Sequence, residues 1–563
     1  MSPRLVFRNG VLSIRTRATT MALLALFGAA FATAAVAQNF IPQGPAPSFG
    51  LADNAQSFDA LPNGTVGGAI QAVLPDPVDA SKMYVGGVNG GVWVTHNGGA
   101  TWTPLSDKQR SLSIASLAFD PTDATRRTLL AGIGITSNGI VGATNADRGG
   151  ERIGILYSNN GGTSWNELGG ATLAGKSIVG VAARGSTLLA AAAEPHDAAA
   201  PGGLYRSIDG GTNFGLVSGT GGLAAGAVSS LAGDAANQSV FYAAVSATGI
   251  YKSGNGGADW SQVLTLGANR IGRVATGANG AIAVGVYDSS SGNPTSGQLV
   301  AVHHSADSGA TWVQLAVPQI NHGSQASTDF AIALDPSNPN IVYVAGDRIA
   351  EPPFTVTAYR LVRQADGGSI VETLTDKGTT DGSTTHADAR TLVFDALGRL
   401  IQGGDGGLYV RSNPQGTGAW TGLNTEGLSL REAYAVAYDS VSRRLVVSAQ
   451  DTGSAYQATP GGQVYNVVGG GGDGVNAVVN DKTLRSQGNS VIYFSSQNLA
   501  PLERNIVDVN GTVISSHIFG TRQGESDILG FAADDFTATP RRVPVRSLPF
   551  SSLIKLNRID PQK

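Results

Sequence analysis

The chain has 563 residues, of which 77 are glycine and 14% are charged, and its formal net charge is −4. Glycine is roughly twice as frequent as in an ordinary soluble protein, and charged residues are well below the usual ~25%. With 42% hydrophobic residues and no cysteine, the composition excludes overall disorder, disulfides, thiolate metal sites and thiol catalysis. The net charge argues against a dominantly electrostatic binder of nucleic acid.

Residues 1–37 have the pattern of a secretory signal peptide. An apolar run spans residues 21–35, the sequence Ala35-Val36-Ala37 forms a cleavage site, and the preceding basic region contains Arg4, Arg8, Arg15 and Arg17. The alternative, a membrane anchor, is disfavoured because the apolar run is short and rich in alanine. We therefore expect an exported protein, in the periplasm, at the cell surface or secreted, with no membrane insertion after cleavage.

After an extended N-terminal segment at residues 38–66, short apolar runs recur about every 50 residues. They begin near residues 70, 114, 178, 228, 270, 329, 388, 433 and 474. Each run is followed by a turn and by further short β-rich segments, as in Met83-Tyr84-Val85-Gly86. Alternating apolar residues with turn signals at this spacing predict four short strands per repeat.

A second pattern marks each of five repeats: Ser or Thr, then Asp or Asn two residues later, a glycine near the centre, and an aromatic residue at the end. Asp and Asn side chains accept hydrogen bonds from turn N–H groups, and glycine adopts positive φ without strain, so the pattern predicts a tight turn with the aromatic ring packed beneath it. The five pairs of acid or amide and aromatic residues are Asn97 and Trp102, Asn160 and Trp165, Asp209 and Phe214, Asn255 and Trp260, and Asp307 and Trp312.

This unit resembles the Asp-box, or BNR repeat, of the sialidase-like propeller superfamily, and also of secreted glycosyl-hydrolase-like and sortilin-type propellers. The resemblance implies an all-β fold, a β-propeller of Asp-box blades, and the nine apolar runs predict about nine four-stranded blades. In that superfamily the boxes lie on the rim of the propeller, so the five pairs are expected to be structural and not catalytic.

Nine or ten blades exceed the usual four to eight of one propeller. We therefore expect tandem propellers, with an Asp-box propeller at 67–430 and further blades of an incomplete second one at 431–563. The alternative is one ten-bladed wheel. A tenth strand is expected at 551–557, and nothing after it could complete a blade. The segment from Pro540 to Lys563 is therefore expected to be loosely packed, or to belong to a blade completed in a longer protein.

The most unusual stretch, residues 386–473, combines acids with glycines. Asp405 and Asp473 lie between glycines, and Asp451 follows Gln450 and precedes Thr452-Gly453. Such acids can converge on one face of a propeller, where they suit general acid and base chemistry on a glycosidic bond or a hard cation such as calcium. Turn chemistry alone is the competing interpretation. The candidate catalytic residues are His386, Asp388, Asp405, Asp451 and Asp473, with Asp405 and Asp451 as candidate calcium ligands.

Two enzyme families related to Asp-box proteins can be compared with the chain. Xyloglucan-cleaving propellers carry a catalytic Asp in an Asp-x-Gly-Gly setting, where this chain has Val88-Asn89-Gly90-Gly91, and the acid of Gly404-Asp405-Gly406-Gly407 is one place late. Sialidases have an early Arg-Ile-Pro segment, which does not precede the first box.

The sequence therefore favours a non-catalytic module that binds or scaffolds a polysaccharide or protein, with no organic cofactor, no nucleic acid partner and an open oligomeric state. The alternative is a glycoside hydrolase acting on polysaccharides through carboxylates of the 386–473 stretch.

Overall fold

The computed structural model describes residues 42–49, 65–137, 149–193, 202–234, 236–290, 295–351, 354–425, 427–469, 472–499, 502–519 and 521–522, and short stretches at 525–526, 543–544 and 554–556. Residues 1–37, predicted to be a signal peptide, lie outside this part of the chain. Among the residues described, no helix has the length and apolar character needed to cross a membrane.

Seven four-stranded antiparallel sheets follow one another between residues 70 and 422. The first sheet contains β3 (Ile70–Pro75), β4 (Met83–Gly87), β5 (Gly91–Thr95) and β6 (Thr103–Pro104), and the second contains β7 (Ile114–Phe119), β8 (Leu129–Ile133), β9 (Ile155–Ser158) and β10 (Asn166–Leu168). The third contains β11 (Ile178–Arg184), β12 (Thr187–Ala192), β13 (Gly203–Ser207) and β14 (Gly215–Leu216), the fourth β15 (Val228–Gly233), β16 (Phe241–Val245), β17 (Gly249–Ser253) and β18 (Ser261–Thr265), and the fifth β19 (Arg270–Thr276), β20 (Ile282–Asp288), β21 (Leu299–Ser305) and β22 (Val313–Leu315). The sixth contains β23 (Ala331–Leu334), β24 (Ile341–Arg348), β25 (Val356–Arg363) and β26 (Ser369–Thr373), and the seventh contains β27 (Ala389–Phe394), β28 (Leu400–Gly404), β29 (Gly407–Arg411) and β30 (Trp420–Gly422). Short helical turns lie between some of them, at α2 (Gly170–Leu173), η2 (Ala278–Gly280) and η3 (Asp376–Gly378).

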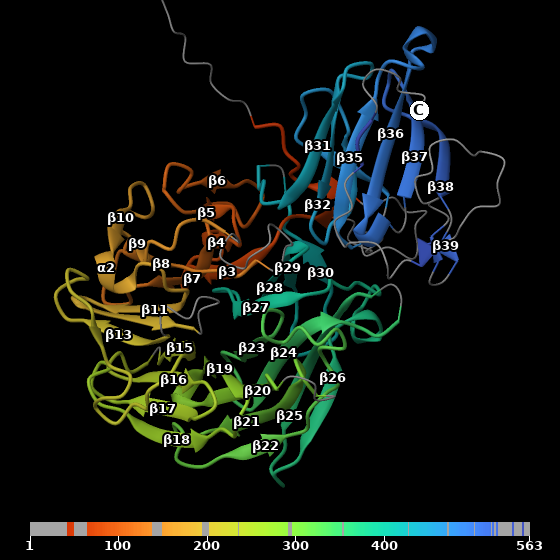
Figure 1. The fold of residues 1–563 in the computed structure, drawn as a ribbon. Helices are drawn as coiled ribbons and strands as arrows, with labels where there is room; N and C mark the ends of the chain where they lie inside the picture. The colour runs from red at the N-terminus through yellow and green to blue at the C-terminus, as the bar shows by residue number, and fades with distance from the viewer. Residues whose placement is uncertain are drawn as a thin grey trace, which may run out of the picture. The chain divides into compact units, whose positions relative to one another are not determined.

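These seven sheets are the blades of a closed ring (Figure 1). The first strand of each blade packs against the first strand of the next, and β27 of the last blade packs against β3 of the first. The ring therefore closes after seven blades, inside the predicted range 67–430. This closure excludes the alternative of one ten-bladed wheel, while the all-β propeller fold itself is confirmed.

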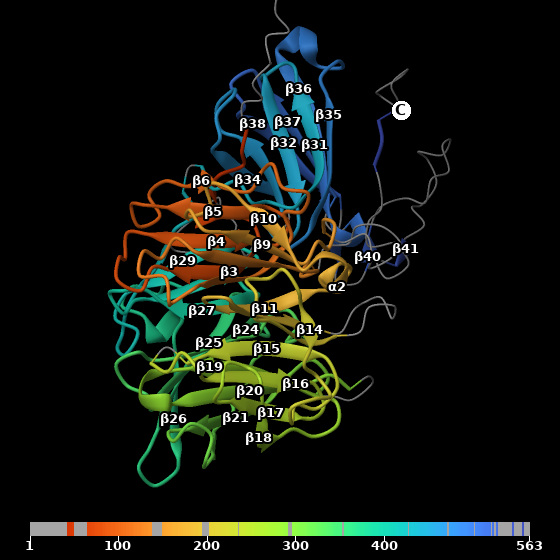
Figure 2. The ribbon, with the colours of Figure 1, turned by 90° about the vertical axis from the view of Figure 1, so that its left-hand side faces the viewer.

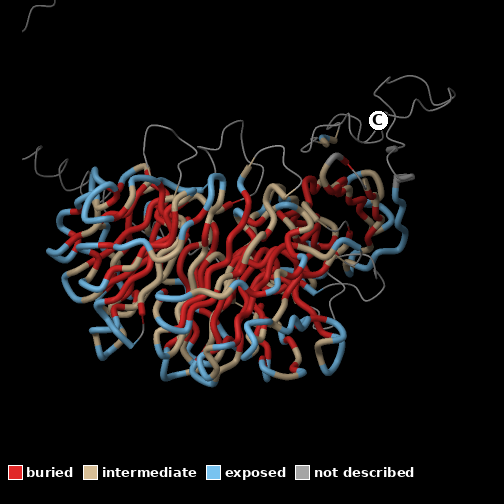
Figure 3. The backbone as a smooth tube through the Cα atoms, turned by 90° about the horizontal axis from the view of Figure 1, so that it is seen from below, coloured by how far each residue is buried: buried red, intermediate tan, exposed pale blue. Residues whose placement is uncertain are grey.

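The four strands of a blade differ in burial because they lie at different distances from the ring axis. Figure 2 shows the fourth blade in order from β15 to β18 at the outer edge. Second strands such as β4, β8 and β16 are buried along their whole length, since neighbouring blades cover both of their faces. The outermost strands β6 and β14 are exposed. Seen from below, buried backbone fills the interior and exposed backbone marks the turns (Figure 3).

Two further sheets follow the ring. One contains β31 (Ala433–Asp439), β32 (Arg444–Ala449), β33 (Ser454–Gln457) and β34 (Tyr465–Gly469), extended by β1 (Ser48–Phe49) and β2 (Thr65–Val66). The other contains β35 (Gly474–Asn480), β36 (Asn489–Ser496), β37 (Leu502–Asp508) and β38 (Val513–Phe519), with helical turns η4 (Arg485–Gln487) and η5 (Gln497–Leu499), and β35 packs against β31. A small sheet is formed by β39 (Thr521–Arg522), β40 (Glu525–Ser526) and β41 (Val543–Pro544).

Two predicted segments outside the ring, residues 38–66 and 551–557, are described in part. Part of the predicted N-terminal extended segment forms a strand: β1 lies parallel to β34, with Ser48 opposite Tyr465. Of the predicted tenth first strand, only residues 554–556 are described. There the Ile554 amide donates to Oδ1 of Asn476 at 2.9 Å, and no strand is assigned to these three residues. The remainder of that prediction lies outside the described residues.

Candidate functional site

Strand direction separates the five turns predicted to be Asp boxes, called box turns below, from the acidic residues. Each box connects the third and fourth strands of its blade, at the end where the first strand finishes. The acids instead lie at the start of a first strand or at the end of a second strand, as Asp388 does before β27 and Asp405 does after β28. Because neighbouring strands are antiparallel, the start of the first and the end of the second meet at the same edge of the blade. The boxes and the acids therefore lie at opposite ends of the blades.

The five box turns share one hydrogen-bond pattern. In the fourth blade, Oγ of Ser253 accepts from the Gly257 amide at 2.9 Å, and Oδ1 of Asn255 accepts from the Asp259 amide at 2.9 Å. The same two bonds occur in the other four boxes, which contain Asn97, Asn160, Asp209 and Asp307. These side chains are therefore engaged in holding their own turns.

Three of the predicted catalytic acids converge. Carboxylate oxygens of Asp388, Asp405 and Asp451 all lie within 4.8 Å of one another. Asp388 and Asp405 flank the β27–β28 pair of the seventh blade, and Asp451 follows β32 of the next sheet, so the cluster forms where these two sheets meet. The Asp451 amide donates to Oδ1 of Asp473 at 3.1 Å, which places the fourth predicted acid beside the cluster.

His386, the fifth candidate, is buried and bonded to backbone. Its Nε2 lies 2.9 Å from the carbonyl oxygen of Asp451, and its Nδ1 lies 3.1 Å from that of Ala387. Burial lowers the pKa of His386, which favours the neutral imidazole. The histidine therefore connects the seventh blade to the following sheet.

One buried cation, Arg390, compensates the acids. Its Nη2 donates to Oδ2 of Asp405 at 3.1 Å, its Nε donates to Oδ1 of the same carboxylate, and Asp329 lies 3.7 Å from Nε. The Nη1 group donates to Oε1 of Gln71 at 3.0 Å and to the carbonyl of Thr136 at 2.6 Å. Arg390 thus connects the seventh blade to the first and second blades, at the point where the ring closes.

Burial keeps several of these acids from ionising easily. The pKa values of Asp388 and Asp451 are raised well above the usual value, first by burial and then by the negative charge of Asp405. Burial also raises the pKa of Asp329 and of Glu432, which accepts hydrogen bonds from Asn89 and, at 3.0 Å, from Ser137. The calcium site predicted at Asp405 and Asp451 stays a prediction. The guanidinium of Arg390 already supplies positive charge to Asp405, which weakens the need for a cation there.

A polar cavity of about 410 Å³ opens at the same end of the ring. It begins where first strands carry a β-bulge, and such bulges redirect a side chain out of the regular alternation. The bulged residues Gln71, Ala115, Val179 and Ser229 all line it. The rest of the lining consists of Ile135, Thr136, Ser137, Arg152, Ser177, Ala193, Arg273, Tyr287, Ser327 and Thr328. Arg390 occupies the equivalent bulge in the seventh blade and contacts Gln71 and Thr136 of this lining.

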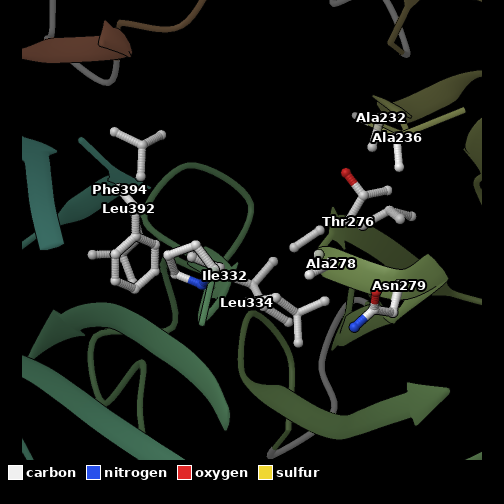
Figure 4. Close-up of a pocket in the computed structure, with 15 residues that line it drawn as sticks. Ala232, Ala236, Thr276, Ala278, Asn279, Ile332, Leu334, Leu392 and Phe394 are labelled. Carbon is white, nitrogen blue, oxygen red and sulfur yellow. The ribbon is translucent and has the colours of Figure 1, made fainter. Parts of the chain in front are cut away.

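The opposite end of the ring holds a different cavity, of about 750 Å³. Figure 4 shows Ile332, Leu334, Leu392 and Phe394 on one side of it and Thr276, Ala278 and Asn279 on the other. It lies at the ends of β15, β19, β23 and β27, where the first strands finish. The two ends of the ring therefore differ in chemistry, one being polar and the other largely apolar.

Neither the polar cavity nor the roles of Arg390, Asp329, Asp347 and Glu432 could be recognised from the residue patterns described above. A usable signal was present: acids recur in pairs fewer than twenty residues apart, as Asp329 with Asp347, Asp388 with Asp405, and Glu432 with Asp451. Each pair begins at the start of a first strand. The β-bulges that shape the cavity arise from the pairing of neighbouring strands. No pattern of residues in the sequence predicted this pairing in detail.

The fold is shared with solved structures of GH74 enzymes. An ancestral GH74 enzyme matches with a TM-score of 0.56 and 16% identity over 80% of this chain and 62% of its own. The GH74 xyloglucanase from Xanthomonas campestris gives 0.53 and 19% over 83% and 66%, and the GH74 enzyme from Niastella koreensis gives 0.56 and 16% over 82% and 67%. The chain thus spans about two thirds or less of these enzymes, and the likeness shows the fold alone. No protein-family model and no curated protein sequence matches the chain.

Proposed function

We propose that the chain is an exported carbohydrate-binding propeller whose ligand occupies the polar cavity of the ring. The observation that carries this proposal is the cavity lining, which combines hydroxyl groups of Ser177, Ser229 and Thr328 with the Gln71 amide and the Tyr287 ring. Ligand sites are concave, of 300–1,000 Å³, and place a few polar groups to orient the ligand. A structural neighbour named as a xyloglucanase supports a carbohydrate ligand.

The state of the acidic cluster supports binding without catalysis. Asp405 is 1% exposed and paired with Arg390, and Asp388 is 8% exposed and accepts from Gln325 at 3.3 Å. A general acid or nucleophile must reach the glycosidic bond of its substrate. Carboxylates that are buried and engaged in this way instead hold the seventh blade against its neighbours.

The proposal is tested by applying the purified protein to an array of plant and bacterial glycans. We expect binding to a defined subset, and we expect Ser327→Trp to abolish it, because Ser327 is an exposed residue of the cavity lining. Ser261→Trp is the matched control, since Ser261 is exposed on the outermost strand β18. Binding that survives Ser327→Trp, or no glycan binding at all, would refute the cavity as a sugar site.

A second function, glycoside hydrolysis, is favoured by one observation. The carboxylates of Asp388, Asp405 and Asp451 lie within 4.8 Å, close to the ~5 Å spacing of retaining glycosidases, and the raised pKa of Asp451 suits a general acid. Release of reducing ends from xyloglucan or another polysaccharide, lost in Asp451→Asn, would establish this function. An inactive wild-type protein that still binds glycans would leave the binding role.

A further inference from the structure

The two arginines that line the polar cavity have no carboxylate partner among the residues that the structure describes. Arg152 and Arg273 are the only charged residues among the described residues that line it. Neither forms a salt bridge with any residue that the structure describes. In contrast, Arg390 beside the cavity is paired with Asp405.

The hydrogen-bonding groups of the cavity are also incompletely used. Nη1 of Arg152 and Oγ1 of Thr136 are buried and have no hydrogen-bond partner in the described part of the chain. Arg273 donates from Nη2 to the carbonyl of Ser327 at 3.1 Å, which holds its guanidinium at the cavity. A buried donor without a partner has lost its water without gaining a new hydrogen bond, and the cost is larger when the donor is charged, so a ligand that accepts from it gains affinity.

We propose that the ligand of this cavity is an acidic sugar, whose carboxylate accepts hydrogen bonds from Arg152 while its hydroxyl groups meet the serine and threonine side chains. This inference rests on the proposed carbohydrate-binding function and specifies its ligand class. A guanidinium presents paired N–H donors that match the two oxygens of a carboxylate, and the resulting bonds are about twice as strong as neutral ones. A neutral sugar would supply no counter-charge to either arginine.

The test is isothermal titration calorimetry of the whole protein with digalacturonic acid and with the neutral galactobiose. We expect the acidic disaccharide to bind at least tenfold more tightly, and its affinity to fall as sodium chloride is added, because salt screens the charge interaction. Arg152→Gln should lower the ratio of the affinity for the acidic disaccharide to that for the neutral one at least tenfold. The substitution breaks no side-chain hydrogen bond with a described residue, so the fold should be retained.

Two further variants make the outcome decisive. Arg273→Gln, in the same cavity, should also lower the acidic preference. Arg399→Gln, at the opposite end of the seventh blade beside Asp395, should leave it unchanged. Equal binding of the two disaccharides, or an unchanged preference in Arg152→Gln, would overturn the acidic ligand while the carbohydrate-binding function stands. Failure of both disaccharides and of every array glycan to bind would refute the function together with its ligand class.

Discussion

Arg390 and Asp405 form a buried ion pair at the point where the ring closes, and Arg390 extends from that pair to the first and second blades. Arg390 is 2% exposed and Asp405 is 1% exposed. The same guanidinium bonds to the side chain of Gln71 and to the carbonyl of Thr136. One side chain therefore links the last blade to the first two, in a ring whose seventh blade is built entirely from its own four consecutive strands.

Removing one partner of this pair should destabilise the protein strongly. For Asp405→Asn we expect a loss of about 3–5 kcal/mol in the free energy of unfolding, because Arg390 would be left as a buried charge with weaker compensation. Denaturant unfolding, followed by tryptophan fluorescence, measures this loss of free energy. The control is Arg110→Gln, which breaks exposed ion pairs with Glu151 and Glu167 and should lower the free energy of unfolding far less, because solvent screens exposed charges. Equal effects of the two substitutions would contradict the role given to Arg390.

Stability should rise as the pH falls from neutral to mildly acidic, because acids with raised pKa values outnumber the three histidines, His303, His304 and His386, whose lowered pKa values act in the opposite direction. A carboxyl whose pKa is raised in the folded state binds more protons there than in the unfolded chain. Its contribution to the free energy of unfolding therefore grows as the pH falls from the raised pKa towards the ordinary value of 3.8. Six acids besides Asp388 contribute in this direction: Asp329, Asp347, Asp376, Glu432, Asp451 and Asp473.

Further acidification should reverse this effect. Hydrogen bonds lower the pKa of the box residues Asp209 and Asp307 to about 2, so their stabilising contribution is lost as the pH falls from 3.8 towards 2. Thermal melting across this range should therefore show a maximum at about pH 4–5. A melting temperature that falls steadily from pH 7 to pH 4 would show that the buried acids contribute less than the opposing histidines.

The box turns allow a clean measurement of backbone strain. Gly98 has φ of +69°, and a Cβ added there would meet nothing within 4 Å. Gly98→Ala should therefore cost about 1–2 kcal/mol through the left-handed backbone alone. In the fifth blade, Ser308 occupies the equivalent position with φ of +60°, so Ser308→Gly should be neutral or stabilising. Destabilisation by Ser308→Gly would show that the Ser308 side chain contributes more than its backbone strain costs.

Calcium should have little effect on the melting temperature. Because Arg390 compensates Asp405, and Asp388 and Asp451 have raised pKa values, we expect about 1 mM calcium to shift the melting temperature by less than about 1 °C. Differential scanning fluorimetry with calcium and with EDTA provides the measurement. A clear rise with calcium, absent in Asp451→Asn, would support the cation site predicted from the sequence.

Local features of the fold could be predicted with good accuracy. First strands were expected near residues 70, 114, 178, 228 and 270, and β3, β7, β11, β15 and β19 begin at Ile70, Ile114, Ile178, Val228 and Arg270. Such features depend on residues close in sequence: alternating apolar side chains make strands, and Asp, Asn, Ser and Gly make turns. The acids of the 386–473 stretch were found in the same way, from their place beside glycines and strand ends.

The amino-acid sequence by itself determined the strands, the turns and the acids that lie at strand ends, because each depends on local periodicity and turn chemistry. Only the tertiary structure decided that the ring closes after seven blades, since closure depends on the packing of β27 against β3, more than 300 residues away. The partners of Arg390 in the first two blades follow from that closure. Burial, which raises the pKa of Asp388 and Asp451, and the bulges, which shape the polar cavity, likewise arise from contacts between strands and blades.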